Sequence, residues 1–173
     1  MRILWAVVAL MVATNAAPAF AKGAKGKKTR AGTAADPNAV VAKTHGGKLW
    51  ILAGPLPGSE GEDLAKWLSS HPSATEVSKK PDEERWAISY VAVFKSPPAR
   101  GPMTIEFFDK KEPRTLVSQD SSQMPGGDSV VFQEPYDIDV NNGFNKGHTY
   151  IMKVGQLIKG KFKTYASGQI TLK

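Results

Sequence analysis

The sequence predicts a mainly β protein, an antiparallel β-sandwich of about seven to eight strands with one short N-terminal α-helix. Apolar side chains recur at every second position through most of the chain from Arg85 to Lys173, which is the spacing of strands with a buried face. Segments containing Pro and Gly interrupt this alternation at short intervals, and no helical pattern lies between them. A helical spacing of apolar residues occurs once, between Glu60 and Ser70.

Residues 1–21 have the order of a secretory signal peptide. Arg2 supplies a positive start, residues 3–13 form an apolar run, and Ala19 and Ala21 are small residues that suit a signal peptidase. The run has eleven residues, whereas a membrane span needs about twenty. An uncleaved membrane anchor is the alternative. We predict an exported protein of the periplasm or cell exterior, without a transmembrane segment after cleavage.

The positive charge is concentrated ahead of the predicted domain. The chain carries 23 Lys and Arg against 16 Asp and Glu, a net charge of +7. Arg2 and five residues from Lys22 to Arg30 account for six basic residues, which leaves 17 basic and 16 acidic residues from Ala31 onward. A nucleic-acid-binding domain carries its basic surplus on the fold, so nucleic acid is not expected as a partner.

The chain has no Cys. This excludes thiolate nucleophiles, Cys-ligated metals and disulfides, so the hydrophobic core has to hold the fold.

Residues 22–38 are rich in Lys, Gly and Ala and contain few side chains suited to burial. We predict a disordered basic linker, which is either an electrostatic tether to an anionic surface or a solvated spacer. Residues 39–173 are then predicted to form a single domain.

A short strand at residues 48–53 opens this domain, and the Gly- and Pro-rich residues 54–58 end it. Ser59 and Glu62 have the spacing of a capping box, which predicts a helix near residues 60–70. Leu64, Trp67 and Leu68 share one face of this helix.

The strand at residues 85–94 carries apolar side chains at both sets of alternating positions. We therefore expect a central strand that is covered on both faces. Polar loops are predicted at residues 73–84 and 121–128. The remaining strands are predicted at residues 103–108, 115–118, 130–133, 136–140, 148–157 and 162–172, with turns at 141–143 and 159–161.

This arrangement resembles an immunoglobulin-like sandwich with an N-terminal helical addition. The resemblance is one of architecture. Trp86 can fill a core position like that of the buried Trp in such domains, and the inter-sheet disulfide of antibody-type domains is absent because there is no Cys. Loops at the open ends of such a fold are places for recognition.

No catalytic motif stands out. His45, His71 and His148 lack metal-ligand spacing, and a Gly-x-Ser-x-Gly motif is absent. A hydrolase using Asp137, Asp139 or His148 is the enzymatic alternative, because alternate positions place both carboxylates on one face of a strand.

Residues 137–143 resemble the start of a calcium loop, in which alternate oxygen donors converge near a glycine. The stretch departs from the EF-hand pattern because its Gly is one position late, His148 replaces the final Glu, and no helices flank it. We favour a plain hairpin turn and predict no metal or cofactor.

The C-terminal hairpin has the most one-sided charge of the predicted fold. The last 28 residues contain six Lys and no acidic residue. Lys159, Lys161 and Lys163 alternate, so in a strand they share one face with Phe162 opposite. Such a row of lysines either binds acidic glycans or lipid head groups or protects an edge strand from aggregation.

We predict a non-enzymatic binding or structural module with a protein or envelope polysaccharide partner. In the narrower alternative of anionic glycan binding, aromatic rings stack on sugars while lysines pair with acidic groups. The candidate ligand-binding residues are Lys159, Lys161, Lys163, Tyr165 and Trp50, with Trp67 as a further aromatic candidate.

Overall fold

Strands make up 47% and helices 15% of the computed structural model, in two sheets with two α-helices. This confirms the predicted mainly β class. The structure describes residues 36–126 and 128–173. The predicted signal peptide and most of the predicted linker lie outside these residues. The last three linker residues belong to the folded part, where Asn38 is buried and an Asp36 carboxylate oxygen accepts a hydrogen bond from the Val130 backbone N–H at 3.0 Å.

Residues 36–126 and 128–173 contain two α-helices where one is predicted. The predicted helix is confirmed as α2 (Gly61–Ser70), and α1 (Ala39–His45) precedes it. The predicted capping box is wrong, because the N-cap is Glu60, which makes no side-chain cap. The Gly61 N–H instead donates to Asn38 Oδ1 at 2.9 Å. The first backbone N–H of α2 therefore has its acceptor in Asn38, the residue that precedes α1.

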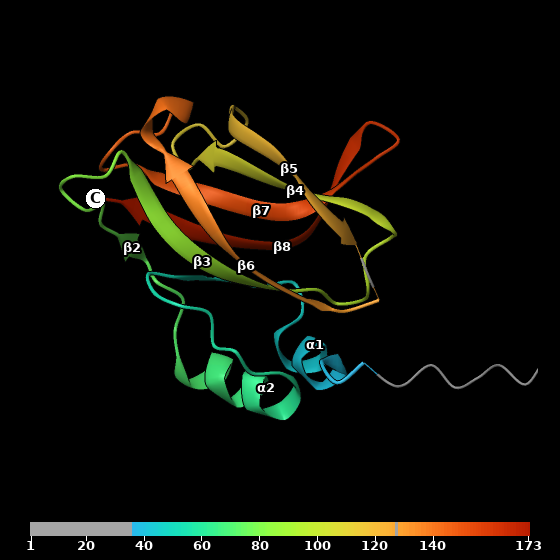
Figure 1. Cartoon of the computed structure of the whole chain (residues 1–173). Helices are drawn as coiled ribbons and strands as arrows, with labels where there is room; N and C mark the ends of the chain where they lie inside the picture. The colour runs from blue at the N-terminus through green and yellow to red at the C-terminus, as the bar shows by residue number, and fades with distance from the viewer. Residues whose placement is uncertain (1–35, 127) are drawn as a thin grey trace, which may run out of the picture. The chain divides into compact units, whose positions relative to one another are not determined.

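The described residues contain eight strands, which form two sheets. Figure 1 shows how these strands are arranged. The three-stranded sheet has the order β1 (Leu49–Leu52), β3 (Arg85–Val93) and β6 (Val131–Asp139). The five-stranded sheet has the order β2 (Glu76–Val77), β8 (Lys161–Leu172), β7 (Thr149–Ile158), β4 (Gly101–Asp109) and β5 (Leu116–Gly126). Neighbouring strands are antiparallel except β2 and β8, which are parallel and so depart from the predicted all-antiparallel arrangement.

Three of the predicted loops and breaks are wrong in detail. β2 lies inside the predicted loop at residues 73–84, and β5 continues through most of the predicted loop at 121–128. The two strands predicted on either side of Pro135 are one strand, β6. β6 is an edge strand, where a proline needs no ladder partner for its missing N–H.

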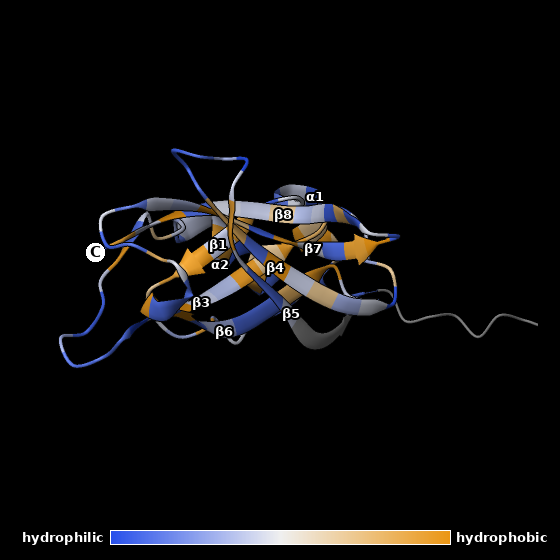
Figure 2. Ribbon diagram, turned by 90° about the horizontal axis from the view of Figure 1, so that it is seen from above, coloured by the Kyte–Doolittle hydropathy of each residue, from blue (hydrophilic) through white to orange (hydrophobic). Residues whose placement is uncertain are grey.

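The buried side chains form two clusters on opposite faces of the three-stranded sheet. The larger cluster lies between the two sheets and includes Trp86, Ile88 and Tyr90 from β3. The smaller lies between the sheet and the helices, where Val91 and Val93 of β3 pack with Leu64 and other residues. β3 is thus covered on both faces, which confirms that prediction. Figure 1 shows both helices on one side of the strands, and Figure 2 shows that the strands contain many apolar residues.

Two tyrosines in the larger cluster differ in whether their hydroxyl groups have partners. Tyr150 Oη accepts a hydrogen bond from the Asn145 backbone N–H at 2.7 Å. Tyr90 is fully buried, and among the described residues its hydroxyl has no hydrogen-bond partner. Burial raises the pKa of Tyr90, and the nearby Glu134 carboxylate raises it further.

The variants Tyr90→Phe and Tyr150→Phe should therefore shift the unfolding free energy in different directions. Removing a buried hydroxyl without a partner should leave stability unchanged or raise it by up to about 1 kcal/mol. Tyr150→Phe leaves the Asn145 N–H unpaired and should cost about 1–2 kcal/mol. Urea denaturation of both variants measures the difference. An equal loss of stability in both would contradict the conclusion that, of the two hydroxyls, only that of Tyr150 has a hydrogen-bond partner within the described part of the chain.

Candidate functional site

The three histidines occupy separate structural positions. His45 is buried, and its Nε2 lies 3.1 Å from the Ala65 carbonyl oxygen on α2. The His71 ring stacks on Trp67 with 4.3 Å between centroids. His148 Nδ1 lies 2.6 Å from Asp109 Oδ2. No group of three or more His, Cys, Asp or Glu within residues 36–126 and 128–173 is arranged to hold a metal ion.

The residues of the hydrolase alternative have separate partners. Asp137 Oδ2 lies 2.7 Å from Arg85 Nη1 across β3 and β6. Asp139 Oδ1 accepts hydrogen bonds from the backbone N–H and the side-chain amide of Asn141, at 2.7 and 2.9 Å. His148 pairs with Asp109, and this hydrogen bond together with one from the Lys111 N–H holds the pKa of Asp109 below its usual value. The described contacts do not bring these three residues together as a catalytic group.

The calcium-loop stretch forms a capped turn. Its residues make a 3₁₀ helix at Val140–Asn142, which Asp139 caps and Gly143 ends with a φ of 84°. Asp139 directs an oxygen to the backbone of this turn, and Asp137 directs one to Arg85. The segment is a turn, but the favoured prediction of a hairpin turn is wrong, because β6 belongs to the three-stranded sheet and β7 to the five-stranded sheet.

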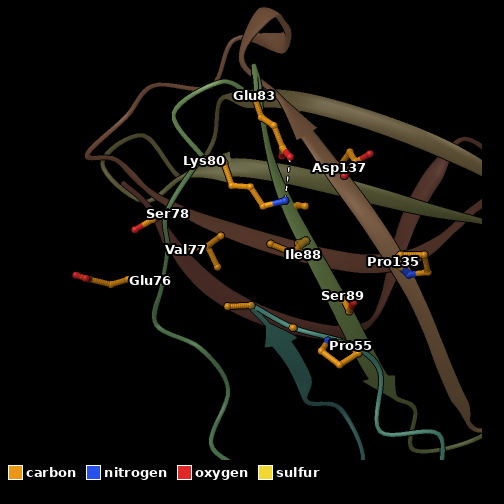
Figure 3. A pocket seen from close by; sticks show the side chains of 13 residues that line it. Pro55, Glu76, Val77, Ser78, Lys80, Glu83, Ile88, Ser89, Pro135 and Asp137 are labelled. Atoms are coloured by element: carbon orange, nitrogen blue, oxygen red, sulfur yellow. Dashed lines mark hydrogen bonds and ion pairs between the residues drawn. The ribbon is translucent and has the colours of Figure 1, made fainter.

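A hollow of about 620 Å³ lies beside β3, beyond the end of β1 (Figure 3). Its walls come from β2 and the segment after it, from the turn after β1, and from Pro135 and Asp137 on β6. Its charged groups are engaged in ion pairs: Lys80 with Glu83 at 2.9 Å, Glu76 with Lys173 at 3.1 Å, and Asp137 with Arg85. The hollow therefore offers no unpaired charge from these walls to a ligand.

A second hollow, of about 600 Å³, lies between α2 and the turn after β1. Its lining is mainly apolar and includes the half-buried Trp67 together with Pro55, Pro57 and Pro72. Trp67 is thus the candidate aromatic residue that lines an open surface, although its ring already stacks on His71.

The basic hairpin, defined here as residues 156–163, joins β7 and β8. Lys159 and Gly160 both have positive φ, 51° and 73°, as in a two-residue type I′ turn. Lys159 therefore lies in the turn, and the prediction that it shares a strand face with Lys161 and Lys163 is wrong. Lys161 and Lys163 follow in β8, with Phe162 between them on the other face.

Two other candidate residues are largely occupied by the fold. Trp50 is 7% exposed, and its ring meets His45 edge-on at 5.1 Å between centroids. It packs against α1 and α2, so its ring is not accessible as a ligand platform. Tyr165 is half-buried: its ring lies 5.4 Å from that of Phe94, and its hydroxyl donates to Gln156 Oε1 at 3.0 Å.

The sequence interpretation missed two residues at the hairpin tip. Leu157 is 49% exposed and Ile158 is 36% exposed. Figure 2 shows the end of β7 in the colour of apolar residues, followed by a hydrophilic turn. The signal in the sequence is an apolar pair placed directly before Lys159-Gly160-Lys161, at the end of the strand predicted at residues 148–157.

Comparison of the chain with protein-family models, curated proteins and solved structures gives no match in any of the three. Within the described part of the chain, no helix is long and apolar enough to cross a membrane. The function is therefore argued from the chain's own residues.

Proposed function

We propose that the chain is an exported, non-enzymatic binding module that attaches to anionic surfaces of the periplasm or cell exterior through the basic hairpin. The observation that carries the proposal is the exposed group of Lys159, Lys161 and Lys163 at the end of one hairpin. None of the ion pairs among the described residues uses these three lysines. The last 28 residues contain no acidic residue that could neutralise them locally.

The order of the strands supports an immunoglobulin-like assignment of the fold. With β1, β3, β4, β5, β6, β7 and β8 lettered A, B, C, C′, E, F and G, the sheets have the orders A-B-E and G-F-C-C′, with the two-residue strand β2 added beside G. Tyr150 lies at the start of strand F, and its hydroxyl bonds to the backbone of Asn145 upstream, which is the arrangement of a tyrosine corner. In this scheme the basic hairpin is the F–G hairpin, at one end of the sandwich.

Export and a binding role are supported together by the N-terminal segment. Its first 21 residues have the signal-peptide order, and the next nine carry five basic residues. A basic tail and a basic hairpin on one chain would add their attraction for the same anionic surface. The glycan alternative is less favoured because Trp50 is buried and Trp67 stacks on His71.

The test measures binding of the full chain to polygalacturonate beads and to neutral dextran beads at low and high salt. The variant Lys159→Gln, Lys161→Gln, Lys163→Gln is compared in a background whose five basic tail residues are also Gln. At about 1 kcal/mol for each lysine near an anionic surface, we expect roughly hundredfold weaker binding to the anionic beads. High salt should weaken binding of the unsubstituted chain, since it screens exposed charges.

The matched control is Lys43→Gln, Lys66→Gln, Lys110→Gln, which removes the same charge from exposed positions elsewhere. It should retain most of the binding. If the two triple variants lose binding equally, net charge rather than the hairpin is responsible and the proposal is wrong.

A further inference from the structure

We propose that the tip of the basic hairpin inserts into the interface of an anionic lipid bilayer. The inference rests on the proposed function and deepens it, because it names a lipid surface as the partner. It is carried by the exposed aliphatic pair Leu157 and Ile158, placed directly beside the three lysines of the hairpin.

The pairing within the hairpin continues beyond the last residue pair between β7 and β4. β7 pairs with β4 only as far as Gly155, whereas its pairing with β8 continues to Ile158 and Lys161. The end of the hairpin is therefore a two-stranded ribbon (Figure 1). Residues 99–102 lie beside this ribbon and line a hollow of about 300 Å³ with Leu157, Ile158 and Lys159. The exposed turn and the exposed side chains next to it are the part that can meet a flat surface.

The two faces of the ribbon both present apolar side chains near the turn. Leu157 lies opposite the half-buried Phe162, and Ile158 lies opposite Lys161. Four large apolar residues of the described chain are exposed, and Leu157 and Ile158 are the two that are adjacent in sequence. Apolar groups at such a tip lower the free energy when they leave water at a membrane interface, and the neighbouring lysines can remain near phosphate groups.

Charge and polarity favour a lipid over the other occupants. A polysaccharide could pair with the lysines but offers no apolar phase for the aliphatic side chains. A second copy of the chain could cover the aliphatic side chains, but it would bring two sets of three lysines together. An anionic bilayer complements both the charge and the apolar surface.

The hairpin is held in place before any contact is made. Gln156 is buried, and its Nε2 donates to the carbonyl oxygens of Ala99 and Gly101 at 2.8 and 3.3 Å. Its Oε1 accepts the hydroxyl of Tyr165. Gln156 thus fixes the base of the ribbon to the loop before β4, which reduces the ordering cost of binding.

The experiment uses the full chain in the tail-neutralised background, with sedimentation on vesicles of phosphatidylcholine alone or mixed with phosphatidylglycerol. We expect binding to the anionic vesicles. The variant Leu157→Ser, Ile158→Ser should weaken it on the order of tenfold, and the lysine triple variant roughly hundredfold. The matched control, Val40→Ser, Leu116→Ser, removes two other exposed apolar residues and should change binding little.

Insertion itself is measured with a fluorophore at Leu157→Cys, which gives a single thiol because the chain has no Cys. Anionic vesicles should shift its emission to the blue, while a label at Lys111→Cys should stay in water. Vesicle binding without a blue shift, or insensitive to the serine variant, overturns insertion and leaves the proposed function standing. If the tail-neutralised chain with an intact hairpin binds neither anionic vesicles nor polygalacturonate, both insertion and the proposed function are wrong. If the chains associate with one another in the absence of vesicles and this requires Leu157 and Ile158, the hairpin tip contacts a second copy of the chain instead.

Discussion

Replacement of Gly155 by alanine should destabilise the fold by about 2–3 kcal/mol, because the added methyl group overpacks a site with no free space. A Cβ at this position would overlap the backbone carbonyl oxygen of Lys163 and come within 2.8 Å of Phe162 Cζ. The pairing of β7 and β8 is irregular here, between Val154 and Gly155. The clash with backbone can be relieved only by moving the strands apart.

The matched control is Gly54→Ala, since a Cβ there has no neighbour within 4 Å. Urea denaturation should show a lower midpoint for Gly155→Ala and little change for Gly54→Ala. Because Gly155 is at the base of the basic hairpin, vesicle binding should weaken as well. A Gly155→Ala protein with unchanged stability would show that the β7–β8 register is not as described.

Trp86→Ala should have the largest effect of the core substitutions, a loss of about 3–5 kcal/mol. Trp86 is 2% exposed and lies between the sheets opposite Ile138 of β6. The substitution removes the ring from the larger cluster and also removes the donor to the Lys173 carbonyl oxygen, a hydrogen bond of 2.9 Å. A loss of this size is a large fraction of the stability of an ordinary domain.

Trp67→Ala provides the comparison, because Trp67 is half-buried and lines an open hollow. Its removal should cost far less than that of Trp86. Thermal unfolding of the two variants measures the difference. If Trp67→Ala were the more damaging change, the larger cluster would not be the main stabilising core.

Alternation predicted β3 well because both faces of this strand are covered, so both sets of alternate residues are apolar. It failed for β5, whose side chains from Ser118 to Ser121 are polar because it is an edge strand. The two residues of β2 are too few for any period, and they pair with Thr171 and Leu172 nearly a hundred positions along the chain. Similarly, the capping of α2 by Asn38 depends on a tertiary contact that local sequence does not contain.

The sequence predicted the lysines of the basic hairpin but not the exposed apolar side chains beside them. Lys159, Lys161 and Lys163 are visible in the sequence as a cluster without acidic neighbours. The exposure of Leu157 and Ile158 follows from where β4 stops pairing with β7, which is a property of the sheet. The sequence does not show that Trp50 is covered, because α1 has only seven residues and is not indicated by the sequence.

The backbone of Lys173 makes three hydrogen bonds with the rest of the fold. The Lys173 N–H donates to the Val77 carbonyl oxygen at 2.8 Å, and its own carbonyl oxygen accepts from the Lys79 N–H and the Trp86 indole. Deletion of Lys173 would therefore not be a silent change, because it removes the acceptor of the Trp86 indole N–H. A fusion partner is better joined ahead of Asp36 than after Lys173.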